Sequence, residues 1–330
     1  MQTLKDAAEE ASADDEADAT PGRGIANRPQ KSNRPQKGTS LASAVTAAVA
    51  GPRDAIAIRP KYATLFVTAG TLSGAIGAVV DRQVRAGAAD RGCIRLLAID
   101  ADDKPIGLAH DRFLQLVHPT KGTSGFGTNP TAGGLEAVDR AQPEIEAAIT
   151  AKWVELLEDA ASPHPQVPAA QVTRVVVIAG CGGVSGSVGY RLADWIIPLA
   201  ERLGVANTLV DWVLLAPEMS IKAVDRTVEP RANEFILSNF SQTMRRHLAR
   251  YAESRSVAGM SDAQAADALL LFGQKNYAGE ATTTIADFVE LVGRTVAMRF
   301  LTAAGSHAEA RHIDSFGIGS VLGRIESADR

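Results

Sequence analysis

The sequence predicts an α/β protein in which a parallel sheet carries helices on both faces. Three observations lead to this fold class. Short, nearly continuous apolar runs alternate along the chain with stretches of helical periodicity, as in βαβ units. These runs lack the alternation of a strand with one exposed face, which is typical of parallel strands buried on both faces. Glycine-rich turns follow several of the runs, where a parallel sheet binds its ligands.

Two apolar runs form the first half of the predicted sheet. The run Leu65–Thr68 (LFVT) is the first expected strand, and a helix over Ala75–Ala86 follows it. The run Ile94–Ile99 (IRLLAI) is the second expected strand. A longer helix is expected over Leu135–Asp159, before the next apolar run.

Two further runs complete the expected strands. They are Val175–Ala179 (VVVIA) and Val210–Leu215 (VDWVLL). Between them, Tyr190–Leu203 has apolar residues at three- and four-residue spacing, which predicts an amphipathic helix. Strands that alternate with helices in this way imply right-handed crossovers between parallel neighbours.

The last third of the chain is expected to be mainly helical. Arg231–Glu253 predicts one long central helix, and helical segments follow around Ala263–Leu271 and Ile285–Leu301. No strong strand is expected there, although His312–Leu322 could hold a short one.

Residues 1–55 are predicted to be a disordered, charged tail. The acidic run AAEEASADDEADAT is followed by a basic stretch rich in Pro, Asn, Gly and Ser, which buries too little apolar surface to offset the entropy cost of ordering. The pentapeptide NRPQK occurs twice there, which is low complexity and not a structural repeat. The tail is either a solvated segment or a tether for a protein partner or an anionic surface.

Composition excludes several classes of protein. The 330 residues are 45% hydrophobic and 22% charged, which excludes a collagen, a coiled coil or a mostly disordered chain. A net charge of −4 gives no electrostatic case for nucleic acid. Two cysteines, Cys93 and Cys181, make neither a disulfide framework nor a zinc site, so we expect a reducing, cytoplasmic location. Neither a signal peptide nor a transmembrane run is recognisable.

The loop after the first strand suits a phosphate. In AGTLSGAIGA, Ala69–Ala78, small residues let the backbone approach an anion, and the following helix N-terminus supplies N–H donors. This loop alone also fits a dinucleotide-binding Rossmann fold, and it lacks the G-K-[ST] of a P-loop. Acids follow the second strand at Asp100, Asp102 and Asp103. A Rossmann fold would use such an acid for a ribose hydroxyl, and the alternative is a solvated strand end.

Two more glycine clusters follow. With the acidic turn after the second strand counted as the second loop, the third loop is GTSGFGTNPTAGG, Gly122–Gly134. The fourth loop is AGCGGVSGSVG, Ala179–Gly189, which again stands between a strand and a helix. Two anion-binding loops predict a ligand with several phosphates held from two sides. Ser185 and Ser187 can donate hydroxyl hydrogens to phosphate oxygens. Close packing of helix on sheet explains some of these glycines but not the whole cluster.

The amino-acid sequences of these loops, and their order along the chain, resemble those of the tubulin/FtsZ superfamily. AGTLSGAIGA resembles the first loop of tubulin, AGQCGNQIGA, and GFGTNPTAGG from Gly125 resembles the G-x-G-A-N-P loop of FtsZ. GCGGVSGSVG from Gly180 is similar to the superfamily signature GGGTGTG, with Val184 in place of its third glycine. DRTVEPRAN, Asp225–Asn233, is similar to a tubulin loop, and ANEFIL from Ala232 resembles the start of the central helix.

This resemblance implies a GTP or GDP site, with Mg²⁺ beside the phosphates. Asp100 and Asp102 would lie near the nucleotide and its Mg²⁺, Glu229 would bind the ribose, and Asn233 would bind the guanine edge. The other implied nucleotide-binding residues are Gly70, Thr71, Leu72 and Ser73 in the first loop, Gly125, Gly127, Thr128 and Asn129 in the third, and Gly180, Cys181, Gly182, Gly183, Val184, Ser185, Gly186 and Ser187 in the fourth.

The resemblance also implies hydrolysis completed by a neighbouring subunit. The segment IADFVEL carries Asp287 and Glu290 at the spacing of the FtsZ acids, although the Asn of that motif is absent. We expect these acids to act in trans, because a helix over Arg231–Glu253 would carry the chain about 30 Å from its start. Head-to-tail contacts that do not close give a filament. The alternative is an ordinary solvated pair of acids on a helix.

The expected organisation is a tail at 1–55, a nucleotide-binding domain at 56–255, and a helical region with the acidic loop at 256–330. The superfamily's second domain would be truncated or absent. Two other functions remain open. One is a nucleotide-bound scaffold that does not hydrolyse. The other is an NAD(P)-dependent Rossmann oxidoreductase, which lacks a Tyr-x-x-x-Lys pair because Asp194 stands four residues after Tyr190.

Overall fold

The computed structural model describes residues 56–87, 92–102, 104–105, 107–116, 135–160, 172–205, 207–217, 234, 236–242, 244–245, 269–273, 284–302 and 313–316. All of them belong to one compact unit, Thr39–Arg330. The predicted tail, residues 1–55, lies outside the described residues.

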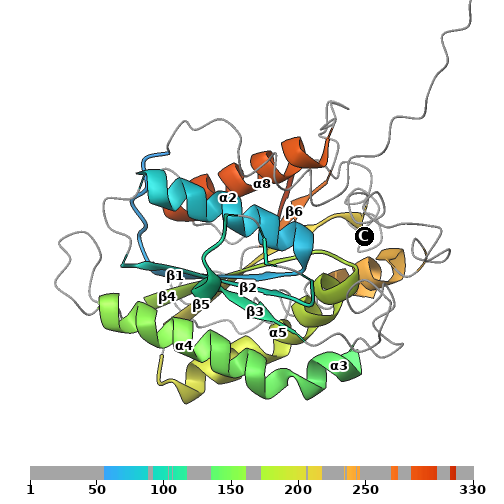
Figure 1. Cartoon of the computed structure of the whole chain (residues 1–330), viewed down its shortest axis with the longest axis horizontal. Helices are drawn as coiled ribbons and strands as arrows, with labels where there is room; N and C mark the ends of the chain where they lie inside the picture. The colour runs from blue at the N-terminus through green and yellow to red at the C-terminus, as the bar shows by residue number, and fades with distance from the viewer. Residues whose placement is uncertain are drawn as a thin grey trace, which may run out of the picture. The chain divides into compact units, whose positions relative to one another are not determined.

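The centre of the fold is a parallel sheet, ordered β3-β2-β1-β4-β5-β6-β7, as Figure 1 shows in part. Every pair of neighbouring strands is parallel. The strands are β1 (Ala63–Ala69), β2 (Ile94–Asp100), β3 (Phe113–Gln115), β4 (Val172–Ala179), β5 (Asn207–Leu215), β6 (Leu269–Phe272) and β7 (Ile313–Phe316). The predicted fold class is therefore confirmed, and each of the four expected strands lies within β1, β2, β4 or β5.

Helices cover both faces of this sheet. Helices α2 and α8 pack on one face, and α4 and α5 pack on the other (Figure 1). Helical residues 236–242 belong to the same side as α5, because Ile236 and Phe240 join its core. The bounds are α2 (Thr71–Gly87), α3 (Leu135–Arg140), α4 (Gln142–Ala160), α5 (Gly183–Arg202) and α8 (Ile285–Leu301), with a 3₁₀ turn, η1, at His110–Arg112.

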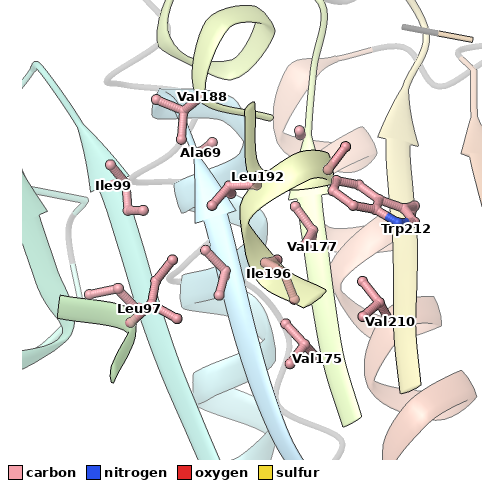
Figure 2. Close-up of a cluster of buried hydrophobic side chains, with 14 of the residues drawn as sticks. Ala69, Leu97, Ile99, Val175, Val177, Val188, Leu192, Ile196, Val210 and Trp212 are labelled. Carbon is pink, nitrogen blue, oxygen red and sulfur yellow. The ribbon is translucent and has the colours of Figure 1, made fainter. Parts of the chain in front are cut away.

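Apolar side chains between α5 and the central strands hold this helix against the sheet. Val188, Leu192 and Ile196 lie on one stripe of α5, and Figure 2 shows them against the side chains of the central strands. Val177 of β4 and Trp212 of β5 are among these partners. Spacing of three and four residues puts such side chains on one face of a helix, so the apolar pattern itself fixes how α5 docks.

The structure differs from the sequence-based expectation in the last third. Helix was expected through Leu271, but Leu269–Phe272 forms strand β6 beside β5. A four-residue apolar run has too few positions to separate a strand from a buried helix by periodicity. Strand β7 confirms the short strand expected within His312–Leu322. Because β6 and β7 continue the sheet, the sheet crosses the boundary predicted at residue 255.

Two other elements were predicted incompletely. The expected helix Leu135–Asp159 is two helices, α3 and α4, and Pro143 stands in the first turn of α4, where its missing N–H costs no hydrogen bond. Of the expected long central helix, residues 234, 236–242 and 244–245 are helical, and its other residues lie outside the described ranges.

Candidate functional site

The order of the strands reverses between β1 and β4. The chain leaves β1 for β2 on one side and leaves β4 for β5 on the other, while β1 and β4 themselves are paired. Helix α2, which follows β1, and helix α5, which follows β4, cover opposite faces. Open α/β sheets bind their ligands at the carboxyl ends of the strands at such a reversal. The last paired residues are Ala69 and Ala179, so the two predicted glycine loops begin side by side.

The first loop is a tight turn from β1 into α2. Gly70 has a φ of 85°, a conformation that favours glycine, and its N–H donates to the Ile99 carbonyl at 2.8 Å. Its own carbonyl accepts from the Gly74 N–H at 2.8 Å, which closes the first turn of α2. The predicted residues Leu72 and Ser73 are buried in that turn. The turn thus sets the start of α2 directly above the end of β1.

Asp100 links this turn to β2. Its carboxylate accepts from the Thr71 hydroxyl at 2.8 Å and from the Ala101 N–H at 2.8 Å. Asp102 lies nearby, with an oxygen 3.3 Å from the same Thr71 hydroxyl oxygen. Asp100 is 3% exposed, and this burial, together with the Asp102 charge, raises its pKa from 3.8 to about 6, against the lowering effect of the Thr71 hydrogen bond. Because the Asp100 carboxylate is buried and already accepts from Thr71 and Ala101, it is poorly placed to bind ribose hydroxyls.

The fourth loop ends in a helix N-terminus without a side-chain cap. Gly182 is the N-cap of α5 and carries no side chain that could cap it. Gly183 has a φ of 56°, which favours glycine, and the loop is anchored because the Cys181 thiol donates to the Leu215 carbonyl at 3.2 Å. The first N–H groups of an α-helix have no partner within the helix. An anion is the partner that the helix dipole favours there.

Packing explains two of the glycines in this cluster. A Cβ at Gly186 would lie 2.8 Å from the Cys181 carbonyl oxygen, and a Cβ at Gly189 would lie 2.6 Å from the Cβ of Ala179. Both approaches are closer than real side chains show. Gly186 therefore lets α5 sit against its own loop, and Gly189 lets it sit against β4. The remaining glycines, at positions 180, 182 and 183, lie in the turn itself.

Ser187 carries a buried hydroxyl with no hydrogen-bond partner. The residue is 1% exposed, and the part of the chain that the structure describes offers its Oγ neither a donor nor an acceptor. Side chains on a helix lean toward its N-terminus, so this hydroxyl lies toward the uncapped end of α5. A buried hydroxyl without a partner costs about 1–3 kcal/mol, and a phosphate oxygen would relieve that cost.

Asn239 contacts the same loop and was not singled out from the sequence. Its Nδ2 donates to the Cys181 carbonyl at 3.0 Å, and the residue is buried. Ile236 and Phe240, which flank it at helical spacing, belong to the core. A polar residue inside such an apolar stripe was the signal available in the sequence, because a buried amide needs a partner.

Part of the predicted site falls outside the described residues. These are the third-loop residues Gly125, Gly127, Thr128 and Asn129, and the predicted ribose and base contacts Glu229 and Asn233. The backbone of Ser185 lies in α5, but its side chain is not described, and Val184 is buried in the core. The structure thus brings together the first loop, Asp100, Asp102 and the fourth loop.

The two predicted catalytic acids differ in their surroundings. Asp287 is exposed in the first turn of α8, where Thr284 caps the helix by accepting from the Asp287 N–H at 3.1 Å. Glu290 forms an ion pair with Arg82 of α2 at 2.5 Å, and both side chains are largely buried. In this structure Glu290 therefore links α8 to α2 within one chain. The catalytic role of both acids stays a prediction.

Helix α8 runs in the same direction as α2. The Arg59 N–H donates to the Leu301 carbonyl at the end of α8, and the preceding residue donates to the Gly87 carbonyl at the end of α2. Midway along, a Cβ at Gly293 would lie 2.6 Å from Val79, so the two helices touch closely there. Because α2 begins at the carboxyl edge of the sheet, α8 begins toward that edge as well.

The helix argument for the remoteness of the acids therefore loses its basis, but Glu290 pairs with Arg82 about three turns along α2, so the distance of the acids from the loops stays a prediction. The expectation was that a long helix over Arg231–Glu253 carries the chain away from the nucleotide. Strand β6 intervenes and returns the chain to the carboxyl edge, where the Ala216 N–H donates to the Phe272 carbonyl at 2.7 Å.

A cavity of about 400 Å³ lies elsewhere, between α2, β2 and α4. Its charged groups are paired with one another: Arg112 with Asp81, and Lys152 with Asp111 and Glu155. No set of three His, Cys, Asp or Glu side chains in the described ranges is arranged as a metal site. Mg²⁺ bound through nucleotide phosphates needs only one or two carboxylates, and the partly exposed Asp102 fits that need. None of the described helices has the length and apolar character to span a membrane.

Comparison with known proteins gives structural likenesses only. No protein-family model and no curated protein matches the chain. Among solved structures it is similar to CetZ from Methanosaeta thermophila, with 16% identity over 72% of this chain and 52% of that chain and a TM-score of 0.39. It is also similar to TubZ from Bacillus thuringiensis serovar israelensis in a GTPγS-form protofilament, with 12% identity over 74% of this chain and 57% of that one and a TM-score of 0.37.

A two-stranded TubZ filament is similar as well, with 13% identity over 77% of this chain and 56% of that chain and a TM-score of 0.38. The chain spans about half of the length of these solved structures. What the chain binds has to follow from its own residues.

Proposed function

We propose that this chain binds a guanine nucleotide, GTP or GDP, whose phosphates lie between the first and fourth loops. The observation that carries the proposal is the pair of glycine loops leaving Ala69 and Ala179 at the reversal of strand order. The uncapped start of α5 and the unpartnered Ser187 hydroxyl supply donors for an anion there. Guanine specificity, with Asn233 and Glu229 as base and ribose contacts, rests on the sequence resemblance.

The proposed assembly is head to tail, with Mg²⁺ beside the phosphates. TubZ was solved as GTPγS-form and GDP-form protofilaments and as a two-stranded filament, which supports a self-associating nucleotide protein. Asp287, exposed at the start of α8, is the predicted acid most available to a neighbouring subunit. The proposed reaction is slow hydrolysis of GTP to GDP and phosphate.

A second candidate is a nucleotide-bound module without hydrolysis. The ion pair of Glu290 with Arg82 favours it, because a carboxylate held within its own chain is less available to orient a neighbour's water. Phosphate release measured against protein concentration separates the two candidates. A rate that rises more than linearly supports hydrolysis between subunits, and no release with bound GTP supports the module.

The binding proposal is tested on purified, full-length protein. The protein is denatured, and any released nucleotide is identified by base and by phosphate count. Direct titrations with GTP, GDP, ATP and NAD follow on nucleotide-free protein. Guanine nucleotide binding is expected, whereas a bound NAD(P), or no binding of any of the four, would overturn the proposal.

Two matched variants locate the phosphates. Ser187→Ala removes the unpartnered hydroxyl of α5, so stability should stay equal or rise while GDP binding weakens by roughly tenfold. Thr68→Val removes another buried hydroxyl without a partner, on the face that α2 covers. This control should leave GDP binding unchanged. Equal binding by Ser187→Ala and wild type would place the phosphates elsewhere.

A further inference from the structure

The interaction of Asn239 with the fourth loop has a consequence for the direction of one peptide group. Asn239 is 5% exposed and donates from Nδ2 to the Cys181 carbonyl oxygen at 3.0 Å. The same oxygen lies so close to Gly186 that an added Cβ would come within 2.8 Å of it. The carbonyl is thus held against α5 and the helical residues 236–242. Among the described contacts, the Asn239 donor and the missing side chain of Gly186 hold this direction.

The N–H on the other side of this peptide bond points the opposite way. The described peptide bonds are all trans, and in a trans peptide the C=O of one residue and the N–H of the next point in opposite directions. The Gly182 N–H is therefore directed away from Asn239 and α5. Within the described ranges no acceptor is found for it. It lies at the carboxyl edge of the sheet, where the loops that follow β1 and β4 begin side by side.

Glycine makes this peptide easy to turn over. The peptide joins Cys181 to Gly182, and Gly183 follows with a positive φ, so two glycines in succession place few steric limits on the backbone. Without the Asn239 donor, the peptide is freer to rotate and to direct its oxygen away from α5, toward that edge. An oxygen there would repel a phosphate that an N–H would bind.

We propose that Asn239 is a positioning residue of the nucleotide site. It holds the Cys181 carbonyl inward, so that the Gly182 N–H at the start of α5 is directed at a phosphate of the nucleotide. This inference rests on the proposed function, and it names the residue that makes the fourth loop an anion site. Asn239 acts through the loop and touches no ligand itself.

The test uses Asn239→Asp in the full chain. Aspartate keeps the size of the side chain, and at pH 8, above the raised pKa of a carboxyl as buried as Asp100, it is ionised, cannot donate and repels the Cys181 carbonyl. Affinities for GDP and for guanosine are measured by titration calorimetry. Because one hydrogen bond to a charged phosphate group is lost, GDP binding should weaken by roughly tenfold or more. Guanosine, which has no phosphate, should bind with nearly unchanged affinity.

Met244→Leu is the matched control. Met244 is buried in the same core and on the same helical segment, and it has no hydrogen bond to the loop. Its GDP-to-guanosine affinity ratio should equal that of wild type. An unchanged ratio in Asn239→Asp, or equal losses for GDP and guanosine, would give Asn239 a purely structural role and overturn the proposal.

A second measurement does not depend on guanine recognition. Inorganic pyrophosphate is titrated into ¹⁵N-labelled protein while the Gly182 amide resonance is followed. A shift in wild type that is absent in Asn239→Asp supports the proposal even if guanine nucleotides do not bind, in which case only the proposed function fails. No shift in wild type, or the same shift in both proteins, overturns the positioning role.

Discussion

Replacing Asp100 with asparagine tests how the first loop is held to β2. Burial raises the pKa of this carboxyl from 3.8 to about 6 in the folded protein. A folded pKa above the unfolded value means that the folded state holds the proton more tightly. The carboxyl therefore stabilises the fold fully below pH 3.8, and this contribution is lost as the pH rises to about 6. The rise in pKa corresponds to about 3 kcal/mol.

Asp100→Asn is neutral at every pH and should remove this dependence. Its amide oxygen can still accept from the Ala101 N–H, and its NH₂ can donate to the Thr71 hydroxyl. The free energy of unfolding of the variant, relative to wild type, should therefore rise by roughly 2–3 kcal/mol between pH 4 and pH 7. Above pH 7 the difference should stay constant.

The measurement is urea denaturation of nucleotide-free protein at a series of pH values. Asp102→Asn is the control, because it removes the neighbouring charge and leaves Asp100 buried. That control should keep most of the wild-type pH dependence. Parallel curves for wild type and Asp100→Asn would refute the reasoning, since the buried carboxyl would then titrate as it does in the unfolded chain.

Three further predictions concern packing, a buried ion pair and hydrolysis. Gly186→Ala should lower the free energy of unfolding by about 1–3 kcal/mol, because its Cβ would meet the backbone of Cys181. Gly182→Ala should lower it by less than about 1 kcal/mol, because its Cβ would meet only an Ile side chain, which can move. Equal losses for the two variants in chemical denaturation would contradict this prediction. Asp211 lies 2.9 Å from Arg174 in the core, an ion pair whose N–H is not aligned for a hydrogen bond. Asp211→Asn should therefore lower the free energy of unfolding by about 3–5 kcal/mol, whereas the double change Arg174→Met with Asp211→Leu should leave it nearly unchanged. An unchanged free energy of unfolding in Asp211→Asn would show that the stability of the fold does not depend on the ion pair. Asp287→Asn should leave GDP affinity unchanged and suppress phosphate release from GTP, and release at the wild-type rate would remove Asp287 from the mechanism.

The sequence alone predicted the parallel sheet and the glycine loops at its carboxyl edge. β1, β2, β4 and β5 contain nearly continuous apolar runs, because both faces of the sheet are covered, and such a run can be recognised within a few residues. The glycine loops that follow β1 and β4 were readable for the same reason, because a turn into a helix is a local requirement. Strand β6 was not predicted from the sequence, because a run of four apolar residues fits a buried helix equally well.

The tertiary structure decided which distant residues meet. Thr71 and Asp100 are 29 residues apart, Cys181 and Asn239 are 58 apart, and Arg82 and Glu290 are 208 apart. Such contacts depend on which strands pair and on which face each helix covers, and no local pattern encodes that choice. The raised pKa of Asp100 has the same origin, because its largest cause is burial by the assembled fold. The sequence thus determined the loops, and the order of the strands determined which loops lie together.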